Sequence, residues 1–308
     1  MKVLIVCSGN SGNISPFVKE QGESLQYQGL DIDYFLIKGR GIIGYLKNLP
    51  ILRENIKSQK YDLIHAHYGF SGLLSCLQKM VPTIITFHGS DINIRKNRIT
   101  SYIASKLSVE SIFVHPALPK KIKYRRKKIH IIPCGINLQT FYPIDRDKCR
   151  QKLGFKNNEK HILFSSSFDN KVKNYPLAKK GINLVDKDIN LIELRGYSRE
   201  KVNWLMNAVD LLLVTSHSET GPLVVKEAMA CNCPIVSTDV GDVREVIGNT
   251  EGCYICSYDP GDVADKIKKA LDFGKRTDGQ EKIKHLDQKI ITEKIIGVYN
   301  EVLSNVIT

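Results

Sequence analysis

Short runs of apolar residues alternate along this chain with longer stretches in which apolar residues recur every three or four positions. The short runs favour buried strands, and the longer stretches favour amphipathic helices. Strands separated by helices in this way predict parallel sheets covered by helices, which is the architecture of α/β proteins. In the first half of the chain, the expected strands are 2–7, 31–37, 62–66, 83–87, 111–115 and 130–132.

The pattern starts again in the second half, which predicts a second domain of the same kind. Expected strands here are 161–165, 190–194, 211–215 and 235–237, and expected helices begin near 175 and cover 200–208 and 223–230. The halves join near Phe141-Tyr142-Pro143, so we expect one domain over 1–143 and another over 144–288. A last amphipathic helix begins near Gln280, and its final part, 289–308, is expected to pack back on the first domain.

A loop of small and polar residues, 8–13, follows the first expected strand. Ser15 and Pro16 then predict the start of a helix, with Ser15 at the N-cap and Pro16 at the first helical position. The loop lacks the full G-x-G-x-x-G spacing of a dinucleotide fingerprint, so it fits a tight turn as well as a loop that approaches a phosphate.

The composition is that of a soluble globular protein, with 308 residues of which 42% are hydrophobic and 25% charged. The apolar run at the N-terminus, 3–7, is too short for the core of a signal peptide. No apolar stretch approaches the roughly 18 residues of a membrane span. We therefore expect a cytoplasmic protein.

Basic residues are concentrated in the first half of the chain. Residues 1–150 contain 23 Lys and Arg against 10 Asp and Glu, whereas residues 151–308 contain 22 of each kind. The densest run is KKIKYRRKK at 120–128. This run fits a solvated loop or helix face, or a surface that meets an anionic partner such as nucleic acid or an acidic membrane.

Two close cysteine pairs, Cys231 with Cys233 and Cys253 with Cys256, raise the question of a zinc site. The second pair lies in an expected strand, where residues three apart face opposite sides. We therefore expect free, mostly buried thiols. Asp31-Ile32-Asp33 has the spacing of an acidic metal motif, but it begins an alternating strand, so we expect solvent-facing carboxylates and no metal.

The most informative stretch for function is 216–247, SHSETGPLVVKEAMACNCPIVSTDVGDVREVI. Glu219 falls in the loop after an expected strand, and Glu227 falls one turn into the next helix. The helix N-terminus between them presents free amides and the positive end of the helix dipole, which suit a phosphate. Carboxylates beside it suit sugar and ribose hydroxyls. On spacing alone, the two glutamates fit a solvated surface equally well.

This stretch resembles the signature of family 4 of the retaining glycosyltransferases, S-E-G-F-G-L-x-x-x-E-A-M-A-x-G-x-P-V-V-x-x-x-x-G-G, with its two glutamates eight residues apart. Three further segments resemble the family in the same order along the chain: HAHYGFSG at 65–72, TFHGSD at 86–91 and HIIPCGINLQTFYP at 130–143. The resemblance covers most of the chain. It implies an α/β protein of the GT-B fold, in which two Rossmann-like domains with parallel sheets face each other across a cleft.

The resemblance implies roles for residues of the second half. Glu219 would bind hydroxyls of the donor sugar at the reacting centre, and Glu227 would bind the ribose hydroxyls. The turn Thr220-Gly221-Pro222 and the backbone amides of Leu223 and Val224 would hold the diphosphate.

Further positions are implied in the same way. Lys173, in FDNKVKNY, would bind the phosphates, and the backbone of Gly196-Tyr197-Ser198 would recognise the base. His88 would face the reacting sugar from the first domain, and Gly12 would approach the diphosphate. Without the resemblance, His88 could equally be a histidine that caps or fills a turn, and Lys173 could equally be an ordinary surface lysine.

The sequence departs from the family pattern in places. Phe168 stands where an Arg is usual, five residues before Lys173, and Lys171 or Arg195 could supply the missing charge. Glycine is usual at three further positions, which here are Thr220, Pro222 and Asn232.

The resemblance implies transfer of a sugar, with retention at the anomeric carbon, from a UDP- or GDP-sugar to an acceptor hydroxyl, without a metal or other cofactor. It suggests work on capsule, lipopolysaccharide or exopolysaccharide. From the basic run 120–128 and the excess positive charge of the first half, we hypothesise a lipid-linked acceptor and reversible peripheral contact with an anionic membrane. The alternatives are a basic nucleic-acid-binding protein, or a GT-B-fold epimerase or phosphorylase. Against these, the sequence has no recognised nucleic-acid module and no context for a pyridoxal-phosphate lysine.

Overall fold

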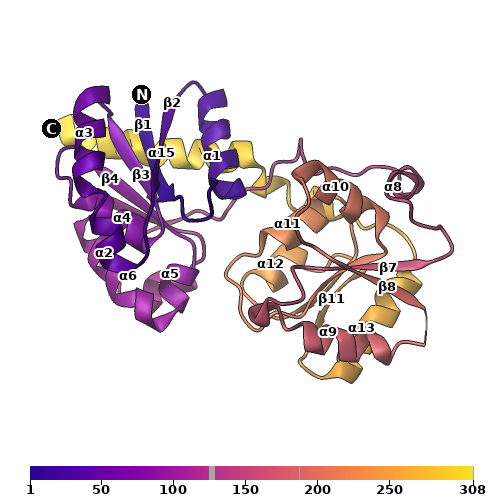
Figure 1. The fold of residues 1–308 in the computed structure, drawn as a ribbon. Coiled ribbons are helices and arrows are strands. Elements are labelled where there is room, and N and C mark those ends of the chain that lie inside the picture. Colours follow the sequence, from indigo (N-terminus) through magenta and orange to yellow (C-terminus); the bar gives the residue numbers. More distant parts are fainter. Residues whose placement is uncertain (125–128, 187, 308) are drawn as a thin grey trace. The chain divides into compact units, whose positions relative to one another are not determined.

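The computed structural model describes residues 1–124, 129–186 and 188–307. The chain forms two compact units, one made of Met1–Gly135 with Gln288–Thr308 and the other of Ile136–Asp287. Each unit contains a parallel sheet with helices packed on it (Figure 1). The division falls a few residues before Phe141-Tyr142-Pro143, where the sequence predicts the join.

The sheet of the N-terminal unit has the strand order β2-β1-β3-β4-β5-β6, and each neighbouring pair is parallel. Its strands are β1 (Lys2–Ser8), β2 (Asp31–Ile37), β3 (Leu63–His67), β4 (Thr83–Phe87), β5 (Glu110–Phe113) and β6 (His130–Ile131). The prediction of a parallel α/β domain is confirmed here, and strand ends differ from the expected ones by a residue or two.

Alternate residues of these strands point to opposite faces of the sheet and fill two cores. Leu4 and Val6 pack with one layer of helices, whereas Val3 and Ile5 pack with the other. The first layer contains α3 (Leu49–Gln59), α4 (Gly69–Cys76) and α6 (Arg95–Leu107), and the second contains α1 (Pro16–Tyr27) and α15 (Gln288–Ile307). The shorter helices are α2 (Gly41–Leu46), α5 (Ser90–Asn93) and α7 (Ala117–Lys121).

Helix α1 begins at Pro16, as predicted. Ser15 takes the N-cap position, but its hydroxyl makes no capping hydrogen bond. Instead its backbone carbonyl accepts the amides of Val18 and Lys19, both at 3.0 Å. The start of this helix is therefore fixed by the proline and the backbone rather than by the serine side chain.

The sheet of the C-terminal unit has the order β11-β10-β9-β7-β8, again with parallel neighbours. Its strands are β7 (Lys160–Phe164), β8 (Ile189–Glu193), β9 (Leu211–Val214), β10 (Ile235–Thr238) and β11 (Cys253–Cys256). The helical segments are α8 (Arg146–Leu153), η1 (Lys171–Lys173), α9 (Tyr175–Asn183), α10 (Arg199–Ala208), α11 (Leu223–Ala230), α12 (Val243–Ile247), α13 (Pro260–Phe273), α14 (Gly279–Lys282) and η2 (Lys284–Leu286). Helices α10, α11 and α12 cover one face of the sheet, and α9 and α13 cover the other.

The expected helix from Gln280 onwards is interrupted, and this prediction was wrong. The chain instead forms α14, then η2, and begins α15 only at Gln288. The reason is that its apolar residues belong to two cores. Ile283 and Leu286 pack in the C-terminal unit, whereas residues of α15 pack against the N-terminal sheet, namely Ile291, Ile295, Val298, Tyr299 and Val302. The prediction that the last helix packs on the first domain is confirmed.

Candidate functional site

Lys173 and Glu219 meet at the carboxyl edge of the C-terminal sheet. Lys173 ends η1, which follows β7, and Glu219 lies in the loop that follows β9. Lys173 Nζ donates to Glu219 Oε1 at 2.6 Å, and the Ser216 hydroxyl donates to the same oxygen at 2.8 Å. Both charged side chains are mostly buried. Ligands of open α/β sheets bind at this edge, so the pair lies where a bound molecule is expected.

The short segment that carries Lys173 is tied to the end of β9. The Thr215 hydroxyl lies 3.0 Å from the carbonyl oxygens of both Lys173 and Asn174, and the His217 amide donates to the Val172 carbonyl at 2.8 Å. Asn174 adopts a left-handed conformation with φ of 54°, which turns the chain into α9. These contacts fix the backbone on which the Lys173 side chain is mounted.

Helix α11 begins beside Glu219. Pro222 occupies its N-cap position, and Leu223 and Val224 are its first two residues, both half-buried. The first amides of a helix have no intrahelical acceptor, so this end can hold an anion. The neighbouring loop presses against Thr220. A Cβ on Gly241, whose φ is +59°, would lie 2.6 Å from the Thr220 carbonyl oxygen.

Glu227, in the middle of α11, is 4% exposed and pairs with Arg199. Arg199 Nη1 donates to Glu227 Oε1 at 2.6 Å, and its guanidinium lies 4.5 Å from the centre of the Phe141 ring. The sequence analysis missed Arg199. A signal was present, because an arginine at the first position of a helix opposes the helix dipole and therefore points to a use for its charge elsewhere.

A second ion pair on α11 was also missed. The ammonium of Lys226, which is almost fully buried, lies 3.2 Å from Asp242 Oδ2. Asp242 follows Gly241, so this pair anchors the loop that contacts Thr220 onto the helix. A Cβ on Gly221 would approach the same carboxylate at 3.0 Å.

The loop Gly196-Tyr197-Ser198 connects β8 to α10. Gly196 is exposed with a φ of +72°. The Ser198 hydroxyl accepts the Lys201 amide at 3.3 Å and so caps α10, and the Tyr197 ring lies 4.8 Å from Lys201 Nζ. These two side chains therefore contact α10, and recognition of a base by the backbone of this loop stays a prediction.

Phe168 packs into the C-terminal unit. Its ring stacks on Tyr175 at 4.2 Å between centroids. Neither candidate replacement for the usual arginine lies in the Lys173–Glu219 cluster: Lys171 is exposed, and Arg195 pairs with Asp169 at 3.4 Å in an exposed position. The basic groups that meet the two motif glutamates are Lys173 and Arg199.

His88 follows β4 in the N-terminal unit, and both of its ring nitrogens contact other side chains. Nε2 lies 2.9 Å from Nδ1 of His67, and Nδ1 lies 3.7 Å from Sγ of Cys134. Its ring centre is 4.8 Å from Phe17 and 4.7 Å from Tyr68. Burial lowers the pKa of His88 to about 3, with the nearby His65 adding to the effect. His88 is therefore a neutral imidazole at pH 7.

Gly12 lies in the exposed loop after β1, with a φ of +86°. A Cβ at this position would meet no atom within 4 Å, so the glycine is required by the backbone conformation rather than by crowding. Gly12 and His88 belong to the N-terminal unit, and the other predicted residues belong to the C-terminal unit. That these two groups line one donor cleft stays a prediction.

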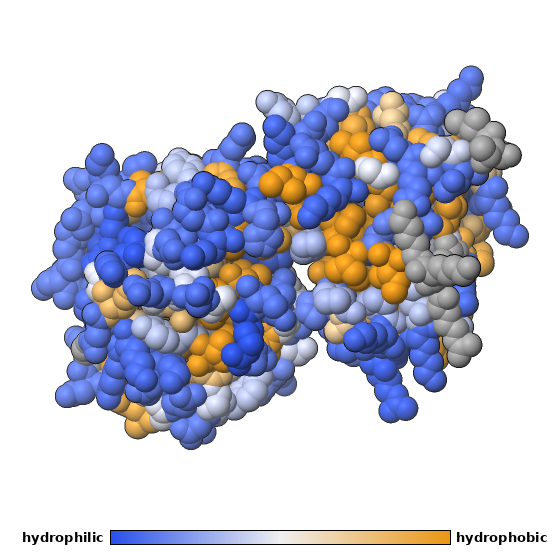
Figure 2. All heavy atoms as spheres, turned by 180° about the vertical axis from the view of Figure 1, so that it is seen from behind, coloured by the Kyte–Doolittle hydropathy of each residue, from blue (hydrophilic) through white to orange (hydrophobic). Residues whose placement is uncertain are grey.

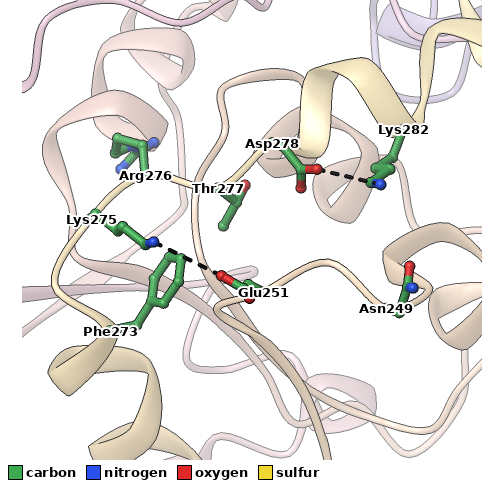
Figure 3. A pocket seen from close by; sticks show the side chains of 8 residues that line it. All are labelled: Asn249, Glu251, Phe273, Lys275, Arg276, Thr277, Asp278 and Lys282. Atoms are coloured by element: carbon green, nitrogen blue, oxygen red, sulfur yellow. Dashed lines mark ion pairs between the residues drawn. The ribbon is translucent and has the colours of Figure 1, made fainter.

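A hollow of about 480 Å³ lies elsewhere on the C-terminal unit (Figure 3). It is lined by Asn249, Glu251, Phe273, Lys275, Arg276, Thr277, Asp278 and Lys282. These residues lie where β11 begins, at the amino ends of the strands, and none of them was predicted as a site residue. Glu251 pairs with Lys275 at 3.9 Å and Asp278 with Lys282 at 3.4 Å, while the Arg276 guanidinium donates to the backbone carbonyls of Val209, Met206 and Cys231.

The two cysteine pairs do not form a metal site in the described part of the chain, where no group of three or more His, Cys, Asp or Glu side chains could hold an ion. All eight thiols are free. Cys253 packs on one face of the sheet and Cys256 on the other, as the strand period predicts.

Asp33 accepts the Tyr61 hydroxyl at 2.9 Å and pairs with Lys2 at 3.3 Å, while Asp31 is exposed. In the described ranges, no helix is long and apolar enough to cross a membrane.

Two family models match the chain: one described as Glycosyltransferase Family 4 over residues 2–140, and one described as Glycosyl transferases group 1 over residues 160–272. An uncharacterized glycosyltransferase of Methanocaldococcus jannaschii is 30% identical over 254 residues, which are 75% of this chain and 72% of that protein. The fold and these matches define a glycosyltransferase of the GT-B type. The chain belongs to glycosyltransferase family 4.

Other similar proteins are more distant. A putative teichuronic acid biosynthesis glycosyltransferase of Bacillus subtilis is 26% identical over 222 residues, covering 63% of this chain and 57% of that protein. Sucrose-phosphate synthase of Thermosynechococcus elongatus has a similar fold, with a TM-score of 0.83, 17% identity and 99% of both chains covered. HepE of Anabaena in complex with UDP and glucose has a TM-score of 0.79 at 14% identity, covering 98% of this chain and 100% of that one.

Proposed function

We propose that this glycosyltransferase moves a sugar from a nucleoside diphosphate, UDP or GDP, to an acceptor hydroxyl with retention of the anomeric configuration. The observation that carries the proposal is the Lys173–Glu219 pair beside the N-terminus of α11. One cation, one carboxylate and a row of free amides at the carboxyl edge of a sheet match the groups of a sugar diphosphate. The complex of the structurally similar HepE with UDP and glucose agrees with such a donor.

In the proposed reaction, the bond between the anomeric carbon and the diphosphate breaks while the acceptor oxygen bonds to the same face of that carbon. The acceptor proton passes to the leaving phosphate. Lys173 and the amides of Leu223 and Val224 stabilise the charge that grows on the diphosphate, and Glu219 orients the sugar through its hydroxyls. Because these groups already supply positive charge, we propose that no metal or other cofactor is needed.

The remaining residues hold the rest of the donor and the acceptor side. Glu227 binds the ribose hydroxyls, with its carboxylate held in place by Arg199, and the backbone of Gly196-Tyr197-Ser198 contacts the base. On the N-terminal unit, Gly12 approaches the diphosphate and neutral His88 contacts the reacting sugar. His88 brings no positive charge to this contact, because its pKa lies far below 7.

For the pathway, we propose the biosynthesis of a cell-surface polysaccharide such as capsule, lipopolysaccharide or exopolysaccharide, in agreement with the teichuronic acid role in the name of the B. subtilis relative. The acceptor is then a lipid-linked saccharide at the inner face of the membrane, reached by a cytoplasmic enzyme. The basic run 120–128 was expected to contact the membrane, but residues 125–128 of that run lie outside the described part of the chain.

The direct test is a panel of UDP-, GDP- and ADP-sugars, screened first for thermal stabilisation. A ligand at 100 times its Kd adds about 2.7 kcal/mol to the free energy of unfolding, which is a readily measured shift. The stabilising donor is then incubated with model acceptors, and the anomeric configuration of the product is read by NMR. An inverted product would contradict retention, and activity abolished by EDTA would contradict metal independence. Tight binding of duplex DNA or RNA without any nucleotide-sugar binding would favour the nucleic-acid alternative.

A further inference from the structure

Three histidines lie in a row inside the N-terminal unit. Polar residues usually lie at the surface, and hydrophilic residues cover most of the face that Figure 2 shows. His65 and His67 are nevertheless 0% exposed, and His88 is half-buried. Alternate residues of a strand share one face of the sheet, so β3 directs His65 and His67 to the same side. A buried polar ring is costly unless it is hydrogen-bonded, which makes the partner of each ring nitrogen informative.

His65 has a partner for each of its ring nitrogens. Nδ1 lies 2.6 Å from the Tyr299 hydroxyl, and Nε2 lies 2.7 Å from the Thr86 hydroxyl. Its ring stacks on that of His67, with 4.6 Å between the ring centres. Because a hydroxyl can either donate or accept, these two bonds allow either tautomer of His65. His65 is therefore explained by the local structure alone.

His67 has a partner for only one of its ring nitrogens. Its Nδ1 lies 2.9 Å from Nε2 of His88. Its Nε2 is buried and has no hydrogen-bond partner among the described residues. Buried N–H groups without an acceptor are rare in folded proteins, and unpaired acceptor atoms are less so. The proton of the neutral His67 ring is therefore on Nδ1, and the unpaired Nε2 is the bare nitrogen.

This tautomer of His67 determines the tautomer of His88. Since Nδ1–H of His67 donates, Nε2 of His88 must accept and carries no proton. Burial lowers the pKa of His88 to about 3, so the ring is neutral at pH 7 and has a single proton, on Nδ1. Nδ1 lies 3.7 Å from Sγ of Cys134. Sulfur is only a weak acceptor, so an oxygen of a bound sugar would be a stronger partner for this N–H.

The end of β3 also holds the His88 ring from the side. Tyr68 directly follows His67, and its ring centre lies 4.7 Å from that of His88. Tyr68 has φ of 72° and ψ of 154°, a backbone conformation that is normally restricted to glycine. Such strain persists where the surrounding structure compensates for it, and it is concentrated at functional sites. Two consecutive residues thus fix one imidazole, one by a hydrogen bond and the other by ring contact.

We propose that His67 is a positioning residue that fixes His88 as its Nδ1–H tautomer, so that His88 donates a hydrogen bond to an oxygen of the reacting sugar. The inference rests on the proposed function, in which His88 contacts that sugar, and it specifies the chemistry of the contact. The bare nitrogen of His88 is occupied by His67. His88 therefore does not act as a general base, and it recognises a hydrogen-bond acceptor on the sugar.

The direct experiment is NMR of the full chain with isotope-labelled histidine, recorded without any donor. Long-range proton–nitrogen correlations distinguish the Nδ1–H tautomer from the Nε2–H tautomer. The signals are identified by their loss in the variants His67→Leu and His88→Ala. We expect both rings to be Nδ1–H tautomers in the wild type, and His88 to lose this fixed state in His67→Leu. An Nε2–H tautomer of His88 in the wild type would overturn the proposal.

Two substitutions of His67 test its effect on turnover. His67→Asn keeps an N–H donor close to the position of Nδ1, whereas His67→Leu fills a similar volume without a donor. Ile56→Ala is the control for lost packing, because Ile56 is buried in the core on the opposite face of the same sheet. Circular dichroism and thermal melting establish that each variant is folded at the assay temperature.

We expect His67→Leu to lower kcat about tenfold with little change in the KM of the donor. His67→Asn should recover most of this loss, and Ile56→Ala should keep a kcat close to that of the wild type. Equal kcat values for His67→Leu and Ile56→Ala would overturn the proposal. A kcat of His67→Asn as low as that of His67→Leu would do the same, because the retained donor would then have no effect.

A second substitution at His88 shows whether His67 acts through it. In the His88→Ala background, His67→Leu should cause no further decrease in kcat. Independent, multiplicative decreases would overturn the positioning role. Thermal stabilisation by nucleotide sugars separates the inference from the proposed function. If no nucleotide sugar stabilises the wild type, the proposed function fails, while the NMR experiment still decides the tautomer. If a donor binds and His88 is an Nε2–H tautomer, only the inference fails.

Discussion

His67 and His88 share a hydrogen bond, with Nδ1 of His67 2.9 Å from Nε2 of His88 and the two rings stacked. One nitrogen donates and the other accepts, so the bond couples the tautomers of the two rings. His65 extends the stack and its Nδ1 lies 2.6 Å from the Tyr299 hydroxyl of α15. Burial lowers the pKa of all three histidines, that of His65 and His88 to about 3.

This row of neutral rings predicts a loss of stability in mild acid. The unfolded chain binds protons at these histidines near the ordinary pKa of about 6.5, and the folded chain does not. Their contribution is therefore present above about pH 6.5 and is lost as the pH falls toward 3. We expect the free energy of unfolding to drop by roughly 1 kcal/mol per histidine between pH 7 and 5.5, as measured by urea denaturation.

The variant His88→Gln tests the assignment. It removes one titrating ring. Below about pH 6.5, the free energy of unfolding of this variant should therefore fall less steeply with pH than that of the wild type, by the equivalent of about one bound proton. Gly241→Ala, which we expect to be destabilised without losing a histidine, should keep the wild-type slope. The same slope in His88→Gln as in the wild type would show that His88 titrates normally in the folded protein.

Lys173→Ala should damage turnover more than folding. If the lysine stabilises the leaving diphosphate, its loss raises the barrier by about 3 kcal/mol, close to a 10²-fold decrease in kcat. Lys171→Ala is the matched control, because it removes an exposed lysine from the same short helical turn. Kinetics of Lys173→Ala that equal those of the control, with the stabilising donor, would remove Lys173 from the site.

Arg199→Met should weaken both stability and donor binding, because it leaves the buried Glu227 carboxylate without its cation. We expect the free energy of unfolding to fall by roughly 1–2 kcal/mol, less than for a fully buried pair, since Arg199 remains 32% exposed. Arg199→Lys should recover part of this stability. In a double-mutant cycle with Glu227→Gln, the double variant should lose less stability than the sum of the losses in the two single variants. Additive losses would mean that the two side chains act independently.

Gly241→Ala should disturb the loop that carries Glu219. Its Cβ would lie 2.6 Å from the Thr220 carbonyl oxygen, and its φ is +59°. Gly248→Ala separates the two effects, because Gly248 has a similar φ of +51° but no atom closer than 4.0 Å. Because of the backbone conformation, we expect Gly248→Ala to lower the free energy of unfolding by about 1 kcal/mol. Gly241→Ala should lower it by more and should also weaken donor binding. Equal losses would show that the Thr220 contact is unimportant.

The hydrophobic pattern was sufficient to predict the strands, the two α/β domains and the position of α11, because these depend on local periodicity. It failed at Gln280, where one continuous amphipathic pattern serves two cores and the chain breaks before Gln288. Periodicity records that Ile283 and Ile291 are buried, but not that they are buried in different units.

The motif resemblance predicted Lys173 and Glu219 as residues of the candidate site, but it did not predict their partners. Arg199 lies outside the matching segments and reaches Glu227 through a tertiary contact. Ser216 and His67 lie within segments 216–247 and 65–72, but their spacing did not predict the contacts with Glu219 and His88. Phe168 shows the opposite case. The sequence revealed that the usual arginine is absent, but only packing shows that the aromatic ring stacks on Tyr175 and that Arg195 pairs with Asp169.

The return of the chain to its first sheet has a consequence for synthesis on the ribosome. When Gly135 has emerged, one face of the N-terminal sheet, including Val3 and Ile5, still lacks one of the two helices that cover it. That helix, Gln288–Ile307, emerges only after the whole C-terminal unit has been made. The C-terminal unit is contiguous and can fold before this helix emerges. The N-terminal unit begins to be synthesised first but is completed last. During translation, part of the apolar face that holds Val3 and Ile5 therefore stays exposed until this last helix has emerged.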